Sequence, residues 1–219
     1  MKLQVNSFET NADPVQTSTE SAKHQQQSDA ILIKEYAAGD LEAFKTLYSR
    51  HKGGLYRYFL RHIADPNLAE DLYQEIWSKV IIQAKHYKPT AKFTTWLYTL
   101  AHNKLVDHIR HLTVVNKVMI DSHETEMTQE PVTAAQVQML NEPENELAAS
   151  RITAALNHCI GQLPQAQKDS FLLKEEAELS VKDIALVLNS SFEASKSRLR
   201  YAYENLRQCL QVKTGRAFL

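Results

Sequence analysis

The chain has few of the residues that build loops, cross-links and membrane spans. Its 219 residues include only 5 glycines and 6 prolines, which is too few for the many tight turns of an all-β fold. Two cysteines, Cys159 and Cys209, do not make a disulfide framework, and we interpret them as small buried apolar residues. No segment approaches the roughly 18 consecutive apolar residues of a membrane helix, and the first residues lack the apolar core of a signal peptide. We therefore expect a cytoplasmic protein without membrane insertion.

Motifs of catalysis and metal binding are also scarce. Nine histidines are present, six of them between His51 and His111. No HExxH pair, paired cysteines, glycine-rich phosphate loop or nucleophile elbow accompanies them. An enzyme is therefore the weakest alternative, and we expect no catalytic residue, no metal and no cofactor.

The net charge of −1 conceals a strong segregation of charge along the chain. Residues 29–115 carry 12 basic and 9 acidic side chains, and residues 151–219 carry 10 and 7. Between them, residues 116–150 carry 1 basic and 7 acidic side chains. The pattern is that of two mildly basic blocks joined by an acidic strip.

Apolar residues recur at helical spacing in two blocks, which predicts an all-α protein of two small helical domains. The blocks cover residues 29–115 and 150–219, and each is large enough to fold without cross-links. Residues 116–149 lose this rhythm, and we interpret them as a flexible acidic linker. Residues 1–28 are rich in Ser, Thr, Gln and Asn, which is typical of a disordered arm.

Local signals predict where the helices begin and end. We expect a long helix from about 68 to 85, and another from Thr94 or Thr95 to about Leu112. The pair Gly53-Gly54 is expected to interrupt the helix before them.

The C-terminal block has the layout of a helix-turn-helix. Ser180 is placed to cap a short helix, a polar turn covers residues 189–191, and a second helix runs from about Phe192 to Leu210. Residues 196–216 hold six basic residues and one acidic residue, which suits the phosphates of a DNA duplex. Ser195 falls on the buried face, where its hydroxyl is expected to bond a carbonyl one turn back. A solvated amphipathic helix of a bundle is the alternative for this segment.

The N-terminal block carries two polar features. The helix over 68–85 has an acidic and amide face, which is either solvated surface or a docking face for a basic partner. The loop over 86–93 brings Tyr87 and two lysines beside a helix that carries Asn103, a combination able to stack on and hydrogen-bond an unpaired base. Core packing is the alternative for the neighbouring Trp96 and Phe93.

These segments resemble a known family. DLYQEIW followed by FTTWLYTLAHNKLVDHIR closely resembles region 2 of extracytoplasmic-function (ECF) sigma factors in the sigma-70 family. LPQAQKDSFLLKEEAELSVKDIALVLNSSFEASKSRLRYAYENLR resembles their region 4, and the two blocks come in the family's order. The resemblance implies a subunit that joins core RNA polymerase at its clamp and directs promoter recognition and melting. It also implies promoter DNA and an anti-sigma factor as partners.

The resemblance assigns roles residue by residue. It implies polymerase docking by Asp71, Gln74, Glu75 and Trp77. It implies −10 element binding by Tyr87, Lys88, Lys92, Asn103 and Arg110. It implies −35 element binding by Lys196, Ser197, Arg198, Arg200 and Arg207.

The recognition helix departs from the family pattern in two places. Glu193, Ala194 and Ser195 stand where Gly-Thr-Val is usual, and Tyr201 stands where Arg is usual. A stand-alone helix-turn-helix regulator with an unrelated N-terminal sensor domain remains the alternative function. Run-off transcription with core polymerase separates the two, because only a sigma factor confers initiation on core enzyme.

Overall fold

The computed structural model describes residues 24–63, 65–120 and 143–215, and this part of the chain is helical without strands. Its elements are α2 (Asp29–Ala37), α3 (Leu41–Ile63), α4 (Pro66–Gln83), the short 3-10 helix η1 (Ala84–His86), α5 (Phe93–Ile120), α6 (Pro143–Gly161), α7 (Gln165–Glu175), α8 (Val181–Val187) and α9 (Phe192–Thr214). The all-α prediction is confirmed. None of the described helices is both long and apolar enough to cross a membrane.

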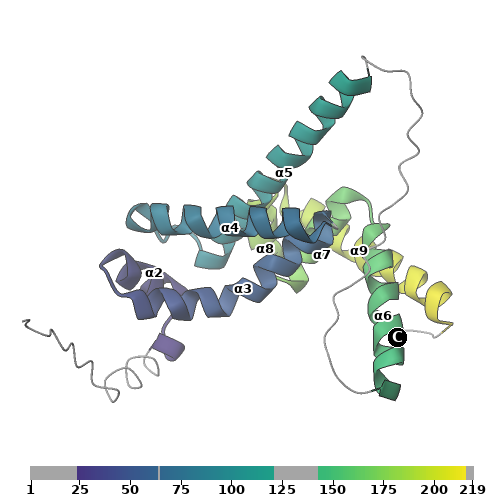
Figure 1. The fold of residues 1–219 in the computed structure, drawn as a ribbon, viewed down its shortest axis with the longest axis horizontal. Helices are drawn as coiled ribbons and strands as arrows, with labels where there is room; N and C mark the ends of the chain where they lie inside the picture. Colours follow the sequence, from purple (N-terminus) through teal and green to yellow (C-terminus); the bar gives the residue numbers. More distant parts are fainter. Residues whose placement is uncertain (1–23, 64, 121–142, 216–219) are drawn as a thin grey trace, which may run out of the picture.

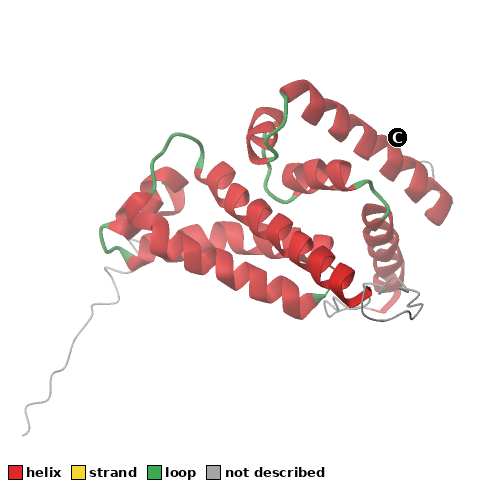
Figure 2. Ribbon diagram, turned by 90° about the horizontal axis from the view of Figure 1, so that it is seen from above, coloured by secondary structure: helices red, strands yellow, loops and turns green. Residues whose placement is uncertain are grey.

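Helices α2 to α5 form one layered group, with α3 packed between α2 and α4 (Figures 1 and 2). Apolar side chains spaced three or four residues apart on each helix meet in its core. The fully buried ones include Leu32, Leu47, Phe59, Ile76 and Leu97. Burying a side chain of this size stabilises the fold by about 1.5–3 kcal/mol, so the periodicity of the sequence accounts for this group.

Helix α3 runs without a break through Gly53 and Gly54, so the expected interruption is wrong. The reason lies in packing. A Cβ on Gly54 would stand 2.3 Å from the backbone oxygen of Glu176, which follows α7 in the other helical group. Gly54 therefore serves a close approach of two backbones rather than a turn.

The ends of α4 and α5 differ slightly from the expected ones. Asp65 caps α4 by accepting hydrogen bonds from the backbone of Asn67 and Leu68, and Pro66 occupies the first helical turn, where its missing N–H costs nothing. Helix α5 begins at Phe93, one or two residues early, and continues to Ile120. The first and last residues of the expected linker therefore belong to α5 and α6. Residues 121–142 lie outside the described part.

Helices α6 to α9 form the second group, in which α9 packs against α6, α7 and α8 (Figure 2). Cys159 of α6 and Cys209 of α9 are joined by a disulfide, with their Cα atoms 5.8 Å apart. Our interpretation of these cysteines as separate apolar residues is therefore wrong. Composition could not reveal the bridge, because it depends on α9 folding back against α6 across a sequence separation of 50 residues.

Residues 24–28, which the sequence places in a disordered arm, are held against α3. The guanidinium of Arg50 donates hydrogen bonds to the backbone oxygens of His24, Gln25 and Gln27 over 2.7–2.9 Å. It also pairs with Asp29 at 2.7 Å. The rest of the expected arm, residues 1–23, lies outside the described part.

Candidate nucleic-acid interface

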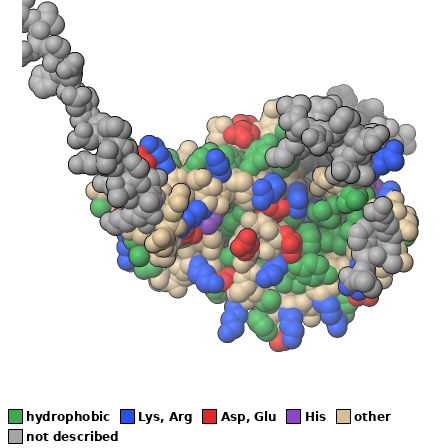
Figure 3. All heavy atoms as spheres, turned by 90° about the horizontal axis from the view of Figure 1, so that it is seen from below, with side chains coloured by type: hydrophobic (Ala, Val, Ile, Leu, Met, Phe, Trp, Pro, Cys, Tyr) green, Lys and Arg blue, Asp and Glu red, His purple; other side chains and the backbone are tan. Residues whose placement is uncertain are grey.

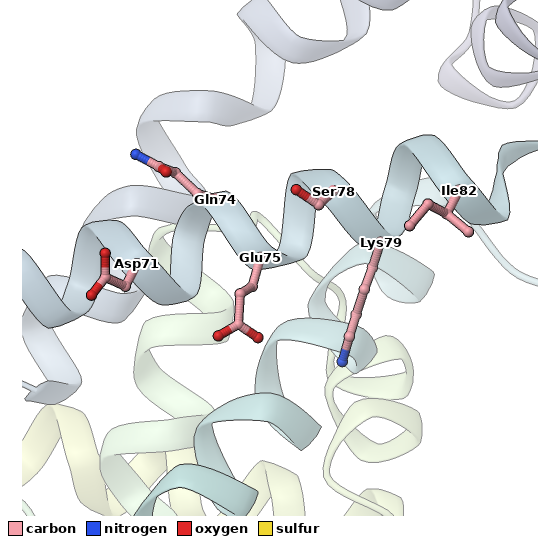
Figure 4. Close-up of a pocket in the computed structure, with 6 residues that line it drawn as sticks. All are labelled: Asp71, Gln74, Glu75, Ser78, Lys79 and Ile82. Atoms are coloured by element: carbon pink, nitrogen blue, oxygen red, sulfur yellow. The ribbon is translucent and has the colours of Figure 1, made fainter.

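The polar face of α4 is exposed, as its sequence predicts. Asp71, Gln74 and Glu75 point away from the core and line a shallow depression with Ser78, Lys79 and Ile82 (Figure 4). Glu75 forms an ion pair with Lys104 of α5 at 2.5 Å. Glu75 is 49% exposed in this pair, so a partner's basic group can compete for it.

Trp77, the fourth residue assigned to this face, lies beneath it. It is only 5% exposed and packs edge-on against Phe44 and Tyr48 of α3, with ring centroids 5.9 and 4.8 Å away. Trp77 therefore fixes how α4 packs on α3, and the exposed polar face consists of the other three residues.

The loop between η1 and α5 is organised by aromatic contacts. Half-buried Tyr87 packs edge-on against Trp96 and Phe93, with centroids 5.2 and 6.1 Å apart. Its hydroxyl donates a hydrogen bond to the backbone oxygen of Ala91. Phe93 is buried, as the core interpretation expects, whereas Trp96 is only partly buried. The arrangement leaves an aromatic edge beside the exposed Lys88.

Asn103 and Arg110 lie two turns apart on the exposed side of α5. They line a cleft with Asp107 and His102, and its opposite wall is Val187, Leu188 and Asn189 at the turn between α8 and α9. Burial lowers the pKa of His102, so this ring favours its neutral form in the cleft wall. The structure thus places two of the predicted −10 residues, Asn103 and Arg110, beside the turn of the helix-turn-helix.

The helix-turn-helix is built by local hydrogen bonds. Ser180 caps α8 by accepting from the backbone of Asp183, and Ser191 caps α9 by accepting from Ala194. Ser195 is completely buried, and its hydroxyl bonds that of Ser190 at 2.7 Å, not a carbonyl one turn back as we expected. This pair of serines ties the start of α9 to the turn, so the atypical Ser195 has a structural role.

Three of the predicted −35 residues, Lys196, Arg200 and Arg207, share one side of α9, whereas Ser197 and Arg198 lie further round the helix. Lys196, Ser197, Arg200 and Arg207 are exposed, and Arg198 is half-buried. The guanidinium of Arg200 lies 4.7 Å from the ring centre of Tyr201, so the atypical tyrosine orients a neighbouring cation rather than contributing a charge. On the face that Figure 3 shows, Lys and Arg side chains are interspersed with acidic and apolar ones.

Three carboxylates of the second helical group face the first group, and our sequence reasoning missed them. The carboxylate of Glu176, 4% exposed, pairs with Arg57 and Arg61 of α3, each at 2.6 Å. Asp169 lies 2.9 Å from Nε2 of His62, which is almost completely buried. Because Asp169 and Glu176 are two helical turns apart, their spacing was the available signal for a shared face.

Asp183 completes this contact and reaches the predicted −10 loop. It accepts hydrogen bonds from Thr95 and Lys92, at 3.2 and 3.3 Å, while also bonding Ser180 in its own cap. Burial alone would raise the pKa of Asp183, but the hydrogen bonds from Ser180, Lys92 and Thr95 outweigh burial and lower it. Lys92 is thus engaged by the second helical group in this arrangement.

Comparison with known proteins identifies both groups. The sigma-70 region 2 family model matches residues 47–114, and a sigma-70 region 4 model matches residues 153–206. The ECF RNA polymerase sigma factor SigK of Mycobacterium sp. (strain KMS) is 28% identical over 185 residues, covering 82% of this chain and 89% of the relative. SigW of Bacillus subtilis (strain 168), also named an ECF RNA polymerase sigma factor, is 27% identical over 180 residues, covering 82% and 95%.

Solved structures share the fold. CnrH in complex with the cytosolic domain of CnrY matches with a TM-score of 0.60 and 20% identity, over 85% of this chain and 99% of that one. The sigma factor RpoE in complex with the anti-sigma factor NepR, from Bartonella quintana, matches with a TM-score of 0.59 and 18% identity, over 77% and 97%. Two helical domains, the second ending in a helix-turn-helix, define the class as a two-domain transcription factor. With regions 2 and 4 in order on one chain, the chain belongs to the sigma-70 family and is an ECF RNA polymerase sigma factor.

Proposed function

We propose that this sigma factor docks on core RNA polymerase through Asp71, Gln74 and Glu75 and recognises both promoter elements. Its residues 29–115 would bind the −10 element, residues 150–219 the −35 element, and residues 116–149 would join them. The observation that carries the proposal is the exposure of all three predicted surfaces at once: the polar face of α4, Asn103 with Arg110 on α5, and the basic side of α9.

Promoter opening on this account needs binding energy rather than covalent chemistry. Phosphate contacts from Lys196, Arg198, Arg200 and Arg207, with Ser197 at the groove, would hold the upstream duplex. Unstacking a base costs a few kcal/mol, and stacking on the exposed part of the Tyr87 ring with a hydrogen bond from Asn103 can offset this cost. Lys88, Lys92 and Arg110 would bind the neighbouring phosphates. Polymerase supplies the remaining contacts, because the basic side chains of this chain are dispersed.

The overall test is run-off transcription with sigma-free core polymerase on genomic fragments. Transcripts with defined start sites, together with co-elution of the chain and polymerase, are the expected result. A stand-alone regulator would give neither, and the order of the two sigma regions already argues against that alternative. We also propose an anti-sigma factor as a partner, supported by the complex of the structural neighbour RpoE with NepR.

We expect Glu75→Lys to weaken binding to core polymerase by about tenfold or more, because it reverses a charge on the docking face and loses the pair with Lys104. Binding is measured by competition for core enzyme. Glu42→Lys on α3 is the matched control, since it also reverses a carboxylate that pairs with a lysine, on a helix other than α4, and should leave binding intact. An unchanged dissociation constant for Glu75→Lys would refute the docking face.

Asn103→Ala should reduce open-complex formation by about tenfold while polymerase binding stays within twofold, because leaving a polar group of the captured base without its hydrogen-bond partner costs about 1–3 kcal/mol. Permanganate footprinting measures the open complex, and the competition assay measures binding. Asn67→Ala, another exposed asparagine, is the control. Equal losses in both assays would contradict a role in strand capture.

A further inference from the structure

The buried imidazole of His24 faces two carboxylates. Its side chain is 3% exposed, and its Nε2 lies 3.1 Å from Oδ2 of Asp40 and 3.5 Å from Oε2 of Glu35. The three ligand atoms lie within 4.8 Å of one another. The segment before α2, the last turn of α2 and the α2–α3 connection each contribute one of these groups.

Hydrogen bonds from the described residues leave this cluster partly unsatisfied. Nδ1 of His24 and Oε2 of Glu35 are buried atoms to which no described residue makes a hydrogen bond. The other oxygen of Glu35 accepts from the side-chain amide of Gln27, whose own oxygen is buried and likewise has no partner in the described part of the chain. One proton on Nε2 cannot bond both carboxylates well at the same time. It leaves Oε2 of Glu35, a buried atom of a side chain that is 30% exposed, without a good donor. A cation between the three groups would satisfy the nitrogen and both carboxylates together.

We propose that His24, Glu35 and Asp40 form a binding site for a divalent transition-metal ion, with zinc as the best fit. Zinc takes imidazole nitrogen and carboxylate oxygen at about 2.0–2.2 Å, which places neighbouring tetrahedral ligands about 3.3 Å apart. The two separations from Nε2, 3.1 and 3.5 Å, bracket this value. The nitrogen ligand disfavours magnesium and calcium, which prefer oxygen. This proposal departs from our expectation of no metal, which rested on motifs of short spacing.

The two oxygens of Asp40 have separate tasks at this site. Oδ1 caps α3 by accepting hydrogen bonds from the backbone of Glu42 and Ala43, while Oδ2 faces His24. The Asp40 side chain is 40% exposed, which provides a route for the ion and for a water as fourth ligand. A bound ion would fasten residues 24–28 to α2 and α3, in addition to the hydrogen bonds that Arg50 donates to the same segment.

The test is a zinc titration of the chelator-treated full-length chain in its disulfide-bonded form. A free-thiol assay first verifies that Cys159 and Cys209 are bridged, because free thiols would bind zinc themselves. Calorimetry and elemental analysis should find one zinc per chain, and magnesium should not compete. Zinc should also raise Tm, since a ligand that binds the folded state stabilises it.

Two variants test the ligands. Asp40→Asn keeps the oxygen that caps α3 and removes the charge, so the variant should fold normally. It should bind zinc at least about tenfold more weakly. Losing a direct metal ligand costs no less affinity than losing a residue that hydrogen-bonds to a ligand. His24→Ala should abolish stoichiometric binding, whereas His111→Ala, an exposed histidine, should retain it. Absence of one-to-one binding in the folded chain, or unchanged affinity in Asp40→Asn, would overturn the site. Failure of the transcription assay alone would leave this result intact.

Discussion

Gly54→Ala should separate the two helical groups, although alanine is the better helix former. The added Cβ would stand 2.3 Å from the backbone oxygen of Glu176 and 3.0 Å from the Tyr98 hydroxyl. Neither neighbour is free to move alone, because that hydroxyl donates to the same oxygen. Region 4 must therefore withdraw by about 1 Å or more, at an overpacking cost of about 1–3 kcal/mol. We expect small-angle X-ray scattering to give a larger radius of gyration for the isolated variant.

Gly53→Ala is the matched control for this substitution. Its Cβ would meet only the Nη1 atom of Arg57, at 3.1 Å, and the end of a flexible side chain can shift. It should keep the scattering profile and raise the free energy of unfolding by up to about 1 kcal/mol through helix propensity. Identical profiles for both variants would mean that the approach of Glu176 to Gly54 does not hold the groups together.

Reduction of the Cys159–Cys209 bridge should destabilise region 4 strongly. The chain-entropy account of a bridge closing a loop of this length gives about 4 kcal/mol, because the open unfolded chain gains conformations. For a domain of this size, that corresponds to a fall in Tm of at least about 10 °C. Cys209 is only half-buried, so a reductant can reach the bridge from its side. Calorimetry with and without dithiothreitol measures the difference.

The variant carrying both Cys159→Ser and Cys209→Ser is the control for reduction. Its Tm should lie near that of the reduced protein and should not change with dithiothreitol. The Tm of the region 2 transition should change little in the reduced protein and in this variant. Equal Tm values for the oxidised and reduced chain would show that α6 and α9 are held by packing alone. In a reducing compartment, the Tm of the chain would be that of the reduced form.

Local signals were sufficient for most of the fold. The apolar spacing predicted the faces of α4 and α5, and Ser180 caps its helix as its sequence suggests. These features depend on neighbours within one or two helical turns, and a sequence displays such neighbours directly. The exposed site residues followed for the same reason, since Asp71 and Glu75 lie opposite the buried stripe of their own helix.

Features that join distant segments could not be predicted. Gly54 looked like a helix breaker because its neighbour Glu176 is remote in the sequence. The disulfide and the cluster around His24 depend equally on how helices meet in space. The burial of Trp77 shows a further limit of prediction from the sequence. Resemblance to a family assigns a role to a residue. It does not say whether the side chain touches the partner or holds other residues in place.

The ion pairs of Glu176 with Arg57 and Arg61 bear on how the two regions associate. A buried carboxylate gains little net free energy from its ion pairs, because burial removes its hydration. A buried carboxylate without a cation beside it is strongly destabilising. Such ion pairs therefore favour one relative orientation of the two regions more than they raise the affinity between them. We therefore expect the two domains to associate in one defined orientation, and we expect added salt to weaken that association. Each domain keeps its own apolar core when the two separate.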